Sequence, residues 1–420
     1  MKTCHVWKML EESAQKRHVS FHTPGHKVGK WDITELSYSD NLSCPRGCIA
    51  RAEADIAEIL GAKKSFILTD GSTSGVFSML YAAKCAGVKA VALPALSHKS
   101  VYHACAVLGL TPLLLPSREA DGIPVAVDQA LLTGQAKELF LAADALLLTS
   151  PDYYGNIPDL QAIRALCQAH GKLFLIDGAH GGHLHFEKSL YAGAYADLWV
   201  DGVHKSLPAF TQGAVVSART EVLGEKLLEG GQLFRTTSPS YPIMASVEYA
   251  VKYPRNLELE AQVRAYKQSA LRVYQNRDWT KFCVLFGKNA FEAEKELQKQ
   301  GIFAEFCDGN VLTFYLSPAT KKREFSALCA RLEKLFEKYP YERVQREPAP
   351  LVFEKTGEKE WVELKGAEGR ICAGNCGLFP PCTPLCLDGE RLEKEKLALL
   401  ENASNVFGLK EQKILVYKDE

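Results

Sequence analysis

The chain has 420 residues, of which 47% are hydrophobic and 24% are charged, and its 50 basic residues balance 50 acidic ones. This length favours two domains over one small core, and the zero net charge gives no reason to expect nucleic acid or a membrane surface as a general partner. Because no apolar run of about 18 residues and no signal peptide are visible, we expect a cytoplasmic protein whose 13 cysteines are mostly reduced.

Short apolar runs alternate with amphipathic stretches over the first part of the chain. This pattern predicts strands at 65–69, 90–93, 111–115, 145–149, 172–176, 197–200 and 213–217, and helices at 73–86, 98–108 and 160–170. Strands that alternate with helices indicate an α/β fold with a mostly parallel sheet covered on both faces. Ligands bind such sheets at the carboxyl ends of the strands.

The pattern changes after about residue 251, where Tyr253-Pro-Arg-Asn256 interrupts a helix. Beyond it we predict a long charged helix at 257–275, short strands at 282–286 and 311–315, and helices at 291–300, 322–338 and 391–401. We therefore expect an N-terminal arm (1–30), a large domain (31–255) and a smaller α+β domain (256–420).

An acid and a lysine each follow a predicted strand. Asp177 ends the strand in Leu175-Ile-Asp-Gly-Ala-His180, and Lys205 follows Trp199-Val-Asp-Gly-Val-His204. An enzyme that uses pyridoxal 5′-phosphate (PLP) needs both groups. The lysine amine holds the cofactor as a Schiff base, and a carboxylate keeps the pyridine nitrogen protonated so that the ring can accept electrons. The alternative is an ordinary strand-end aspartate and a surface lysine.

A block of small and hydroxyl residues, Thr69-Asp-Gly-Ser-Thr-Ser-Gly75, lies between a predicted strand and a helix. Gly71 lets the backbone come close to a phosphate, Ser72 and Thr73 offer hydroxyls, and the helix N-terminus offers free N–H groups. This is the expected form of a PLP phosphate site, although the same residues also form a plain helix cap.

Two histidines lie close to these motifs in the predicted fold. His98 begins a helix after a strand, where its imidazole could stack on the pyridine ring or only cap the helix. His204 directly precedes Lys205 and could contact the phosphate or a substrate carboxylate, or only be held in the turn.

In these blocks and several others the sequence resembles the Orn/Lys/Arg decarboxylase family, specifically its shorter members. The resemblance implies the aspartate-aminotransferase-like fold of type I PLP enzymes, with a mostly parallel seven-stranded sheet in the large domain. It covers most of the chain and is looser after about residue 260. The matching segments are Thr23-Pro-Gly-His-Lys27, Asp32-Ile-Thr-Glu-Leu36, Asp70-Gly-Ser-Thr-Ser-Gly75, His98-Lys-Ser-Val101, Ser150-Pro-Asp-Tyr-Tyr-Gly155, Asp177-Gly-Ala-His-Gly-Gly-His183, His204-Lys205 and Thr236-Thr-Ser-Pro-Ser-Tyr241.

The resemblance implies roles for individual residues. Lys205 would carry the cofactor, Asp177 would pair with the pyridine nitrogen, and His98 would stack on the ring. Ala179 and His180 would lie beside it. The phosphate would be held by Gly71, Ser72, Thr73 and His204.

The resemblance also implies a homodimer or a larger assembly. In it, Ser238 of the neighbouring subunit would contact the phosphate, and the arm at Pro24-Gly-His-Lys27 would lie near the active site.

The implied reaction is α-decarboxylation of arginine, lysine or ornithine, as in polyamine biosynthesis. A basic substrate needs an acidic contact at its far end, and the candidates are Asp152, Glu35 and Glu390. Two alternatives remain open. One is another PLP reaction on an amino acid (an aminotransferase, an aldolase or a β-lyase), for which Arg370 could bind a substrate carboxylate. The other is a non-catalytic PLP-binding protein.

Two segments depart from the family pattern. Asp152 takes the place of the threonine in Pro-Thr-Tyr-Tyr-Gly, and Phe379-Pro-Pro-Cys-Thr-Pro384 takes the place of Pro-Pro-Gly-Ile-Pro, which helps to shape the substrate pocket. Four cysteines lie close together near the C-terminus: Cys372, Cys376, Cys382 and Cys386. Their spacing is not that of a known zinc site, so we expect them to pack in the protein interior and to bind no metal, with Cys382 a candidate for the pocket lining. We interpret Cys44 and Cys48 as packing residues too.

Overall fold

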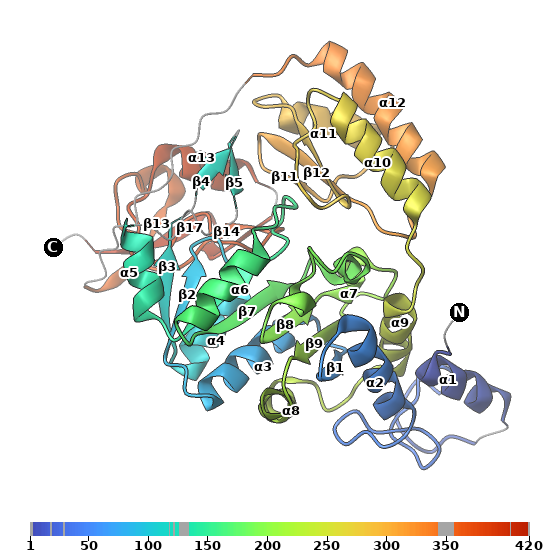
Figure 1. Cartoon of the computed structure of the whole chain (residues 1–420). Helices are drawn as coiled ribbons and strands as arrows, with labels where there is room; N and C mark the ends of the chain where they lie inside the picture. The colour runs from blue at the N-terminus through green and yellow to red at the C-terminus, as the bar shows by residue number, and fades with distance from the viewer. Residues whose placement is uncertain are drawn as a thin grey trace.

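A seven-stranded sheet forms the centre of the molecule (Figure 1). The computed structural model describes residues 3–16, 19–27, 30–116, 118–120, 122–125, 134–342, 357–403 and 405–418. Across the sheet the strands are β1 (Lys64–Leu68), β9 (Ala214–Ala218), β8 (Leu198–Asp201), β7 (Leu173–Gly178), β6 (Ala145–Thr149), β2 (Ala90–Pro94) and β3 (Thr111–Leu115). Within this sheet only β9 runs antiparallel to its neighbours, so the predicted fold class is confirmed.

Helices cover both faces of this sheet because its strands point apolar side chains to both sides. Ile176 and Trp199 belong to one core, whereas their chain neighbours Leu175 and Leu198 belong to the other. The first core also contains side chains of α1 (His5–Gln15), α2 (Cys48–Leu60), α5 (Gly134–Ala142), α6 (Leu160–Ala169) and α9 (Tyr241–Val251), and the second those of α3 (Ser72–Cys85), α4 (Lys99–Leu108) and α8 (Glu221–Phe234).

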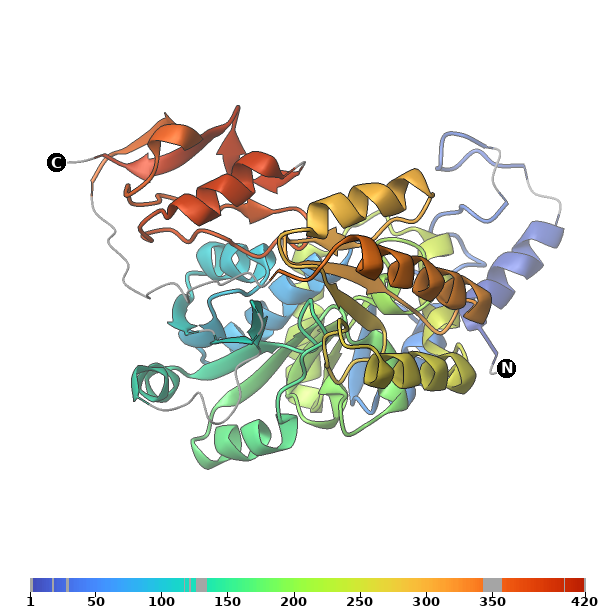
Figure 2. The same cartoon turned by 90° about the horizontal axis from the view of Figure 1, so that it is seen from above.

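The chain after residue 256 forms two units with separate cores (Figures 1 and 2), the first around a three-stranded sheet and the second around a three-stranded and a two-stranded sheet. We call the first the small unit. It contains α10 (Leu257–Ser269), β10 (Lys281–Leu285), α11 (Ala290–Lys299), β11 (Phe306–Cys307), β12 (Val311–Tyr315) and α12 (Lys322–Lys338). We call the second the C-terminal unit. It contains β13 (Lys359–Glu363), β14 (Gly377–Leu378), α13 (Lys394–Asn402), β15 (Val406–Phe407), β16 (Leu409–Lys410) and β17 (Lys413–Tyr417).

One predicted helix is shorter than expected. The pattern predicted a helix at 257–275, but α10 ends at Ser269 and Ala270 is extended. The chain then turns so that Val273 pairs with Val284 of β10, and Tyr274 donates its N–H to the Cys283 carbonyl at 2.9 Å. Because Val273 and Tyr274 are buried in this way, tertiary pairing outweighs local helix propensity.

No helix in the described part of the chain is long and apolar enough to cross a membrane.

The parallel strands at the centre of the sheet bring their carboxyl ends to one edge. Thr149 of β6 is in register with Asp177 of β7, which is in register with Val200 of β8. The connections that leave these three strands therefore start side by side. They carry Asp152, His180 and Lys205.

Candidate active site

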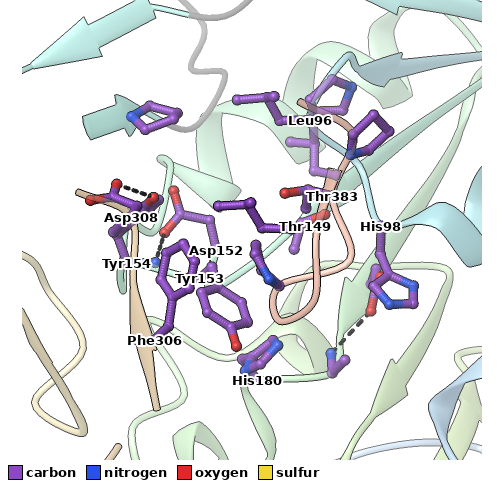
Figure 3. Close-up of a pocket in the computed structure, with 18 of the residues that line it drawn as sticks. Leu96, His98, Thr149, Asp152, Tyr153, Tyr154, His180, Phe306, Asp308 and Thr383 are labelled. Carbon is purple, nitrogen blue, oxygen red and sulfur yellow. Dashed lines mark hydrogen bonds between the residues drawn. The ribbon is translucent and has the colours of Figure 1, made fainter. Parts of the chain in front are cut away.

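A cavity lies at this edge of the sheet and is lined by all three parts of the chain (Figure 3). The large domain contributes its strand ends and helix starts, the small unit contributes Phe306 and Asp308, and the C-terminal unit contributes the segment around Pro381. From the large domain, the polar lining residues are Ser72, His98, Ser100, Thr149, Asp152, Tyr153, Tyr154, Asp177, His180 and Lys205.

Asp177 is a buried carboxylate at the end of β7, with 3% of its surface exposed. The backbone N–H of Ala179 donates to its Oδ1 at 3.1 Å, which is the one hydrogen bond that the described residues give to it. Burial raises the pKa of Asp177, and the charge of Lys205 opposes this. A carboxylate in this position favours a cationic N–H partner, because an uncompensated buried charge is costly.

Lys205 follows β8 in the short helix α7 (Val203–Ser206). Burial lowers the pKa of its amine, and the charge of Asp177 opposes this. A lysine whose pKa is lowered spends more of its time as the neutral amine, which is the nucleophilic form. Its Nζ atom lies 3.2 Å from Nε2 of His180.

The imidazole ring of His180 packs against two tyrosine rings. The ring centroids of Tyr153 and Tyr315 lie 5.0 and 5.4 Å from that of His180, both edge-on. Burial, with the charge of Lys205 second, holds the pKa of His180 well below its usual range, so the imidazole is neutral. Its buried Nδ1 has no hydrogen-bond partner among the described residues.

Of the two roles that the sequence left open for His98, the structure shows the helix cap. His98 caps α4, because its Nδ1 accepts a hydrogen bond from the Ser100 N–H at 3.2 Å, and its ring also lines the cavity. Burial lowers the pKa of His98 to about 3, with the charge of Lys205 as the next cause, so this ring is also neutral.

Of the side chains predicted to hold the phosphate, Ser72 lines the cavity, whereas Thr73, His204 and Ser238 do not. Ser72, the first residue of α3, lines the cavity, and Gly71 before it has a φ of 87° that other residues rarely adopt. Thr73 is exposed and does not line the cavity. His204 is half-buried and donates from Nδ1 to the Gly213 carbonyl at 2.9 Å, outside the lining. Ser238 is exposed in a turn of the same chain.

The residues at the cavity fit PLP. The cavity holds the buried Asp177 carboxylate and the Lys205 amine. It is also lined by Thr149 and His180, and neither the buried Thr149 hydroxyl nor the buried Nδ1 atom of His180 has a hydrogen-bond partner among the described residues. Unpaired buried polar atoms are rare in folded proteins and indicate a missing partner. An aromatic, anionic ligand with polar ring substituents can supply partners of this kind.

The far end of the cavity carries two carboxylates, Asp152 and Asp308 (Figure 3). Asp152 holds its own turn: Oδ1 accepts the N–H groups of Tyr154 and Asn156, each at 2.9 Å, and Oδ2 accepts the Asn156 side chain at 2.8 Å. Burial raises the pKa of Asp152 to about 6. The Tyr154 hydroxyl donates to Asp308 Oδ2 at 2.8 Å.

Sequence reasoning missed Asp308. It lies between β11 and β12 of the small unit, and Asp308-Gly-Asn310 has the composition of an ordinary turn. Its Oδ1 does serve that turn, because it accepts the N–H groups of Asn310 at 2.9 Å and Val311 at 2.7 Å. The sequence holds no signal that this turn would reach the strand ends of the large domain.

Three other candidates from the sequence lie outside the cavity lining. Glu35 accepts the Thr34 hydroxyl at 2.6 Å, and Glu390 is paired with Lys396 and accepts the Leu387 N–H at 2.8 Å. Arg370 donates to Glu360 at 2.7 Å and to the Tyr417 carbonyl at 2.9 Å, within the C-terminal unit. An arginine directed there does not bind a substrate carboxylate in this cavity.

The four cysteines near the C-terminus divide into two kinds. Cys372, Cys376 and Cys386 are fully buried in the core of the C-terminal unit, where the Cys376 thiol contacts the other two. Cys382 is buried but does not line the cavity, although Pro381 and Thr383 on either side of it do. Near the N-terminus, Cys48 packs in the large-domain core and Cys44 is exposed.

Comparisons with known proteins agree with the resemblance seen in the sequence. The family model described as "Orn/Lys/Arg decarboxylase, major domain" matches residues 30–281. An uncharacterized Bacillus subtilis protein, YaaO, is 27% identical over 99% of this chain and 98% of its own length, and the arginine decarboxylase of that organism is 24% identical over 93% and 91%. The solved structure of Escherichia coli constitutive lysine decarboxylase has a TM-score of 0.75 at 21% identity, covering 99% of this chain and 82% of that one.

Proposed function

The chain belongs to the Orn/Lys/Arg decarboxylase family, and from this membership we propose that it is a PLP-dependent decarboxylase of a basic amino acid: arginine, lysine or ornithine. One observation carries the proposal. Within the segment that the family model matches, the Asp177 carboxylate and the Lys205 amine line the same buried cavity. Membership in a family of decarboxylases supports the reaction class, while cofactor and substrate are the proposed parts.

When bound, PLP supplies a ring that accepts the electron pair left on the substrate α-carbon as carbon dioxide departs. Lys205 is the residue that would hold the cofactor covalently, and its lowered pKa keeps part of the amine neutral for that purpose. Asp177 would hold a proton at the ring nitrogen, which at the same time compensates its buried charge. His98 offers a neutral ring for stacking, and Ser72 offers a hydroxyl and the N-terminus of α3 for the phosphate.

The substrate end of the proposal depends on Asp308. A lysine, ornithine or arginine side chain carries a cation several bonds away from its reacting carbon, so its enzyme needs a carboxylate at the far end of the cavity. Asp308 and Asp152 are both there. Both oxygens of Asp152 serve its own turn, whereas Asp308 Oδ2 accepts a hydrogen bond from the hydroxyl of Tyr154, a side chain that also lines the cavity. We therefore assign the contact with the substrate cation to Asp308.

The cavity walls contribute by excluding water. Phe306, Leu378 and Pro381 approach from the small and C-terminal units and close the space above the strand ends with apolar surface. Removal of a negatively charged carboxylate is easier in such a site, because hydration stabilises the starting carboxylate more than the neutral carbon dioxide. Ser238, which is exposed in a single chain, would approach the phosphate from the neighbouring subunit of the proposed homodimer.

The test uses the full chain reconstituted with PLP, as wild type, Lys205→Ala and the matched control Lys89→Ala, in which an exposed lysine is removed. Each is mixed with arginine, lysine and ornithine while visible absorbance and trapped carbon dioxide are measured. With wild type and Lys89→Ala we expect an absorbance band before any amino acid is added and carbon dioxide from one of the three amino acids, and with Lys205→Ala neither that band nor carbon dioxide. Wild type without the band would refute PLP dependence, and a band without carbon dioxide would move the reaction to transamination, aldol cleavage or β-elimination.

A further inference from the structure

A cluster of buried charges lies behind His180, and the proposed mechanism does not use it. Lys281, the first residue of β10, is fully buried. Its Nζ donates to the His180 carbonyl at 3.3 Å and to the Thr280 hydroxyl at 3.2 Å, and lies 3.5 Å from Asp278 Oδ2. The same ammonium lies 4.3 Å from the centroid of the Tyr315 ring.

Asp278 connects this lysine to a second histidine. Its Oδ1 is 2.8 Å from Nε2 of His183 and accepts the Thr280 hydroxyl at 2.7 Å. Burial raises the pKa of Asp278, but the charges of His183 and Lys281 outweigh it and hold this pKa well below its usual range. Asp278 is therefore an ionised, fully buried carboxylate that lies between Lys281 and His183.

The cluster joins two parts of the chain. His180 and His183 lie on the large-domain connection that follows Asp177, while Asp278 and Lys281 belong to the small unit. Lys281 thus holds this connection at the His180 carbonyl, and Asp278 holds it at the His183 ring. The small unit therefore contacts this connection at two points three residues apart, the His180 carbonyl and the His183 ring.

The side chain of His180 is fixed by the same contacts. Tyr315, on which the Lys281 ammonium lies, packs edge-on against His180, and its hydroxyl donates to the Tyr153 carbonyl at 3.0 Å. The Tyr153 ring packs against the imidazole as well. A lysine that holds the His180 carbonyl and the Tyr315 ring therefore acts on both the backbone and the ring of His180.

Fold stability is a poor explanation for this cluster. Desolvating buried ions costs about as much as their attraction returns, and well-packed apolar residues are often as stable or more so. What a buried ionic cluster can add is a defined geometry, because its hydrogen bonds and charges are satisfied in only one arrangement. The element with that defined geometry here is the connection that carries Ala179 and His180 into the cavity.

We propose that Lys281 is a positioning residue: by holding the His180 carbonyl and the Tyr315 ring, it fixes the His180 imidazole against Lys205, so that the small unit sets the geometry of the large-domain site. The effect on turnover rests on the proposed function. The effect on the position of His180 does not, and it can be measured in protein without cofactor.

The experiment compares Lys281→Met with Lys267→Met. Methionine keeps the length of the side chain and removes its charge and donors. Lys267 is a matched control, because it is a buried lysine of the same unit that donates to the Asp278 carbonyl at 2.8 Å and to Asn276 Oδ1 at 2.7 Å and makes no hydrogen bond to His180. For each variant we measure the melting temperature, the imidazole NMR signals of His180 (assigned with His180→Gln) without cofactor, and kcat and KM.

We expect both variants to melt at lower temperature, because each substitution removes one partner only and leaves the buried polar groups that the lysine contacted unpaired, but only Lys281→Met to move the His180 signals. We also expect kcat of Lys281→Met to fall by between about tenfold and a hundredfold, with a smaller change in KM, because misplacement of a catalytic site by about 1 Å costs this much. Lys281→Arg keeps the charge but moves the donor, so it must shift the His180 signals as well, and it replaces Lys281→Met if the latter does not fold.

The outcomes separate the two proposals. If the His180 signals of Lys281→Met match those of Lys267→Met, the positioning role is refuted whether or not the protein releases carbon dioxide. If the wild type releases none while the His180 signals move as expected, the proposed function fails and the positioning role stands. If the signals move but kcat is the same as in Lys267→Met, the position of His180 has no bearing on turnover, and that part of the inference is overturned.

Discussion

Nζ of Lys205 lies 3.2 Å from Nε2 of His180, although the two residues follow different strands of the sheet. The approach is close because Gly202, just before Lys205 in the chain, has no side chain and lies directly against the Ala179 backbone. Burial keeps this imidazole neutral, and which of the two nitrogens donates depends on the protonation of Lys205 and on the tautomer of His180. Nε2 of His180 therefore contacts the lysine that is proposed to carry the cofactor, and Nδ1 of His180 has no hydrogen-bond partner among the described residues.

Replacing Gly202 should disturb both residues at once. A Cβ at this position would lie 2.4 Å from the Ala179 carbonyl oxygen, a backbone atom that cannot rotate away. We expect Gly202→Ala to lower the free energy of unfolding by about 1–3 kcal/mol, as overpacked sites do, and to lower kcat. Gly366→Ala is the control, since a Cβ there meets nothing within 4 Å. Urea unfolding and carbon dioxide release measure the two effects, and equal stability of the two variants would contradict the steric argument.

Asp177→Asn should separate activity from stability. The substitution removes a buried charge that has one hydrogen bond from the described residues, so we expect the cofactor-free protein to be at least as stable as wild type. Activity should fall on the order of a hundredfold or more, because charge stabilisation in a buried site has this magnitude. Asp197→Asn is the opposite case: its carboxylate pairs with Arg164 at 2.6 Å away from the cavity, so it should lose stability and keep activity. The melting temperature measures the stability of each variant and carbon dioxide release measures its activity. An Asp177→Asn protein with full activity would argue against the proposed contact of Asp177 with the ring nitrogen of the cofactor.

Asp308→Asn tests the proposed contact with the substrate cation. The amide keeps an oxygen for the N–H groups of Asn310 and Val311 but removes the charge. A hydrogen bond to a charged group contributes about 1.5–3 kcal/mol, so we expect KM for the preferred amino acid to rise by at least about tenfold. Asp152→Asn, whose oxygen also keeps its own turn, should change KM less. Steady-state kinetics of both variants are the measurement, and a larger KM change in Asp152→Asn would transfer the contact to that residue.

Glu53 should make the stability of the protein depend on pH. It is buried on α2 and accepts the Ile67 N–H at 3.0 Å, and burial raises its pKa from 4.5 to about 7. The folded state therefore binds a proton more tightly than the unfolded state. For this group, stability is highest below pH 4.5, falls by about 3 kcal/mol as pH rises to 7, and is constant above that.

We expect Glu53→Gln to remove this slope, so that the variant gains stability relative to wild type as pH rises through this window. The exposed Glu58→Gln on the same helix is the control and should leave the slope unchanged. Urea unfolding at pH 5, 6, 7 and 8 gives the four points for each protein. A constant difference between Glu53→Gln and wild type over this range would show that Glu53 does not titrate there.

The local parts of this protein were determined by its sequence. The strands of the large sheet were predicted to within about two residues, because apolar periodicity and flanking turn residues act over a few positions. Asp177 and Lys205 could be paired from the sequence alone, since parallel strands end at one edge and residues that follow neighbouring strands must meet there. The family resemblance rests on the same local motifs.

The tertiary structure decided everything that depends on how distant segments pack. The helix predicted through 257–275 stops at Ser269 because Val273 pairs with a strand that follows it in the chain. Asp308 and Lys281 reach the large-domain site only through the docking of the small unit, and Glu390 and Arg370 are turned away from it by partners in their own unit. Local sequence patterns carry no information about such contacts, because their free energy comes from surfaces that are brought together only in the folded chain.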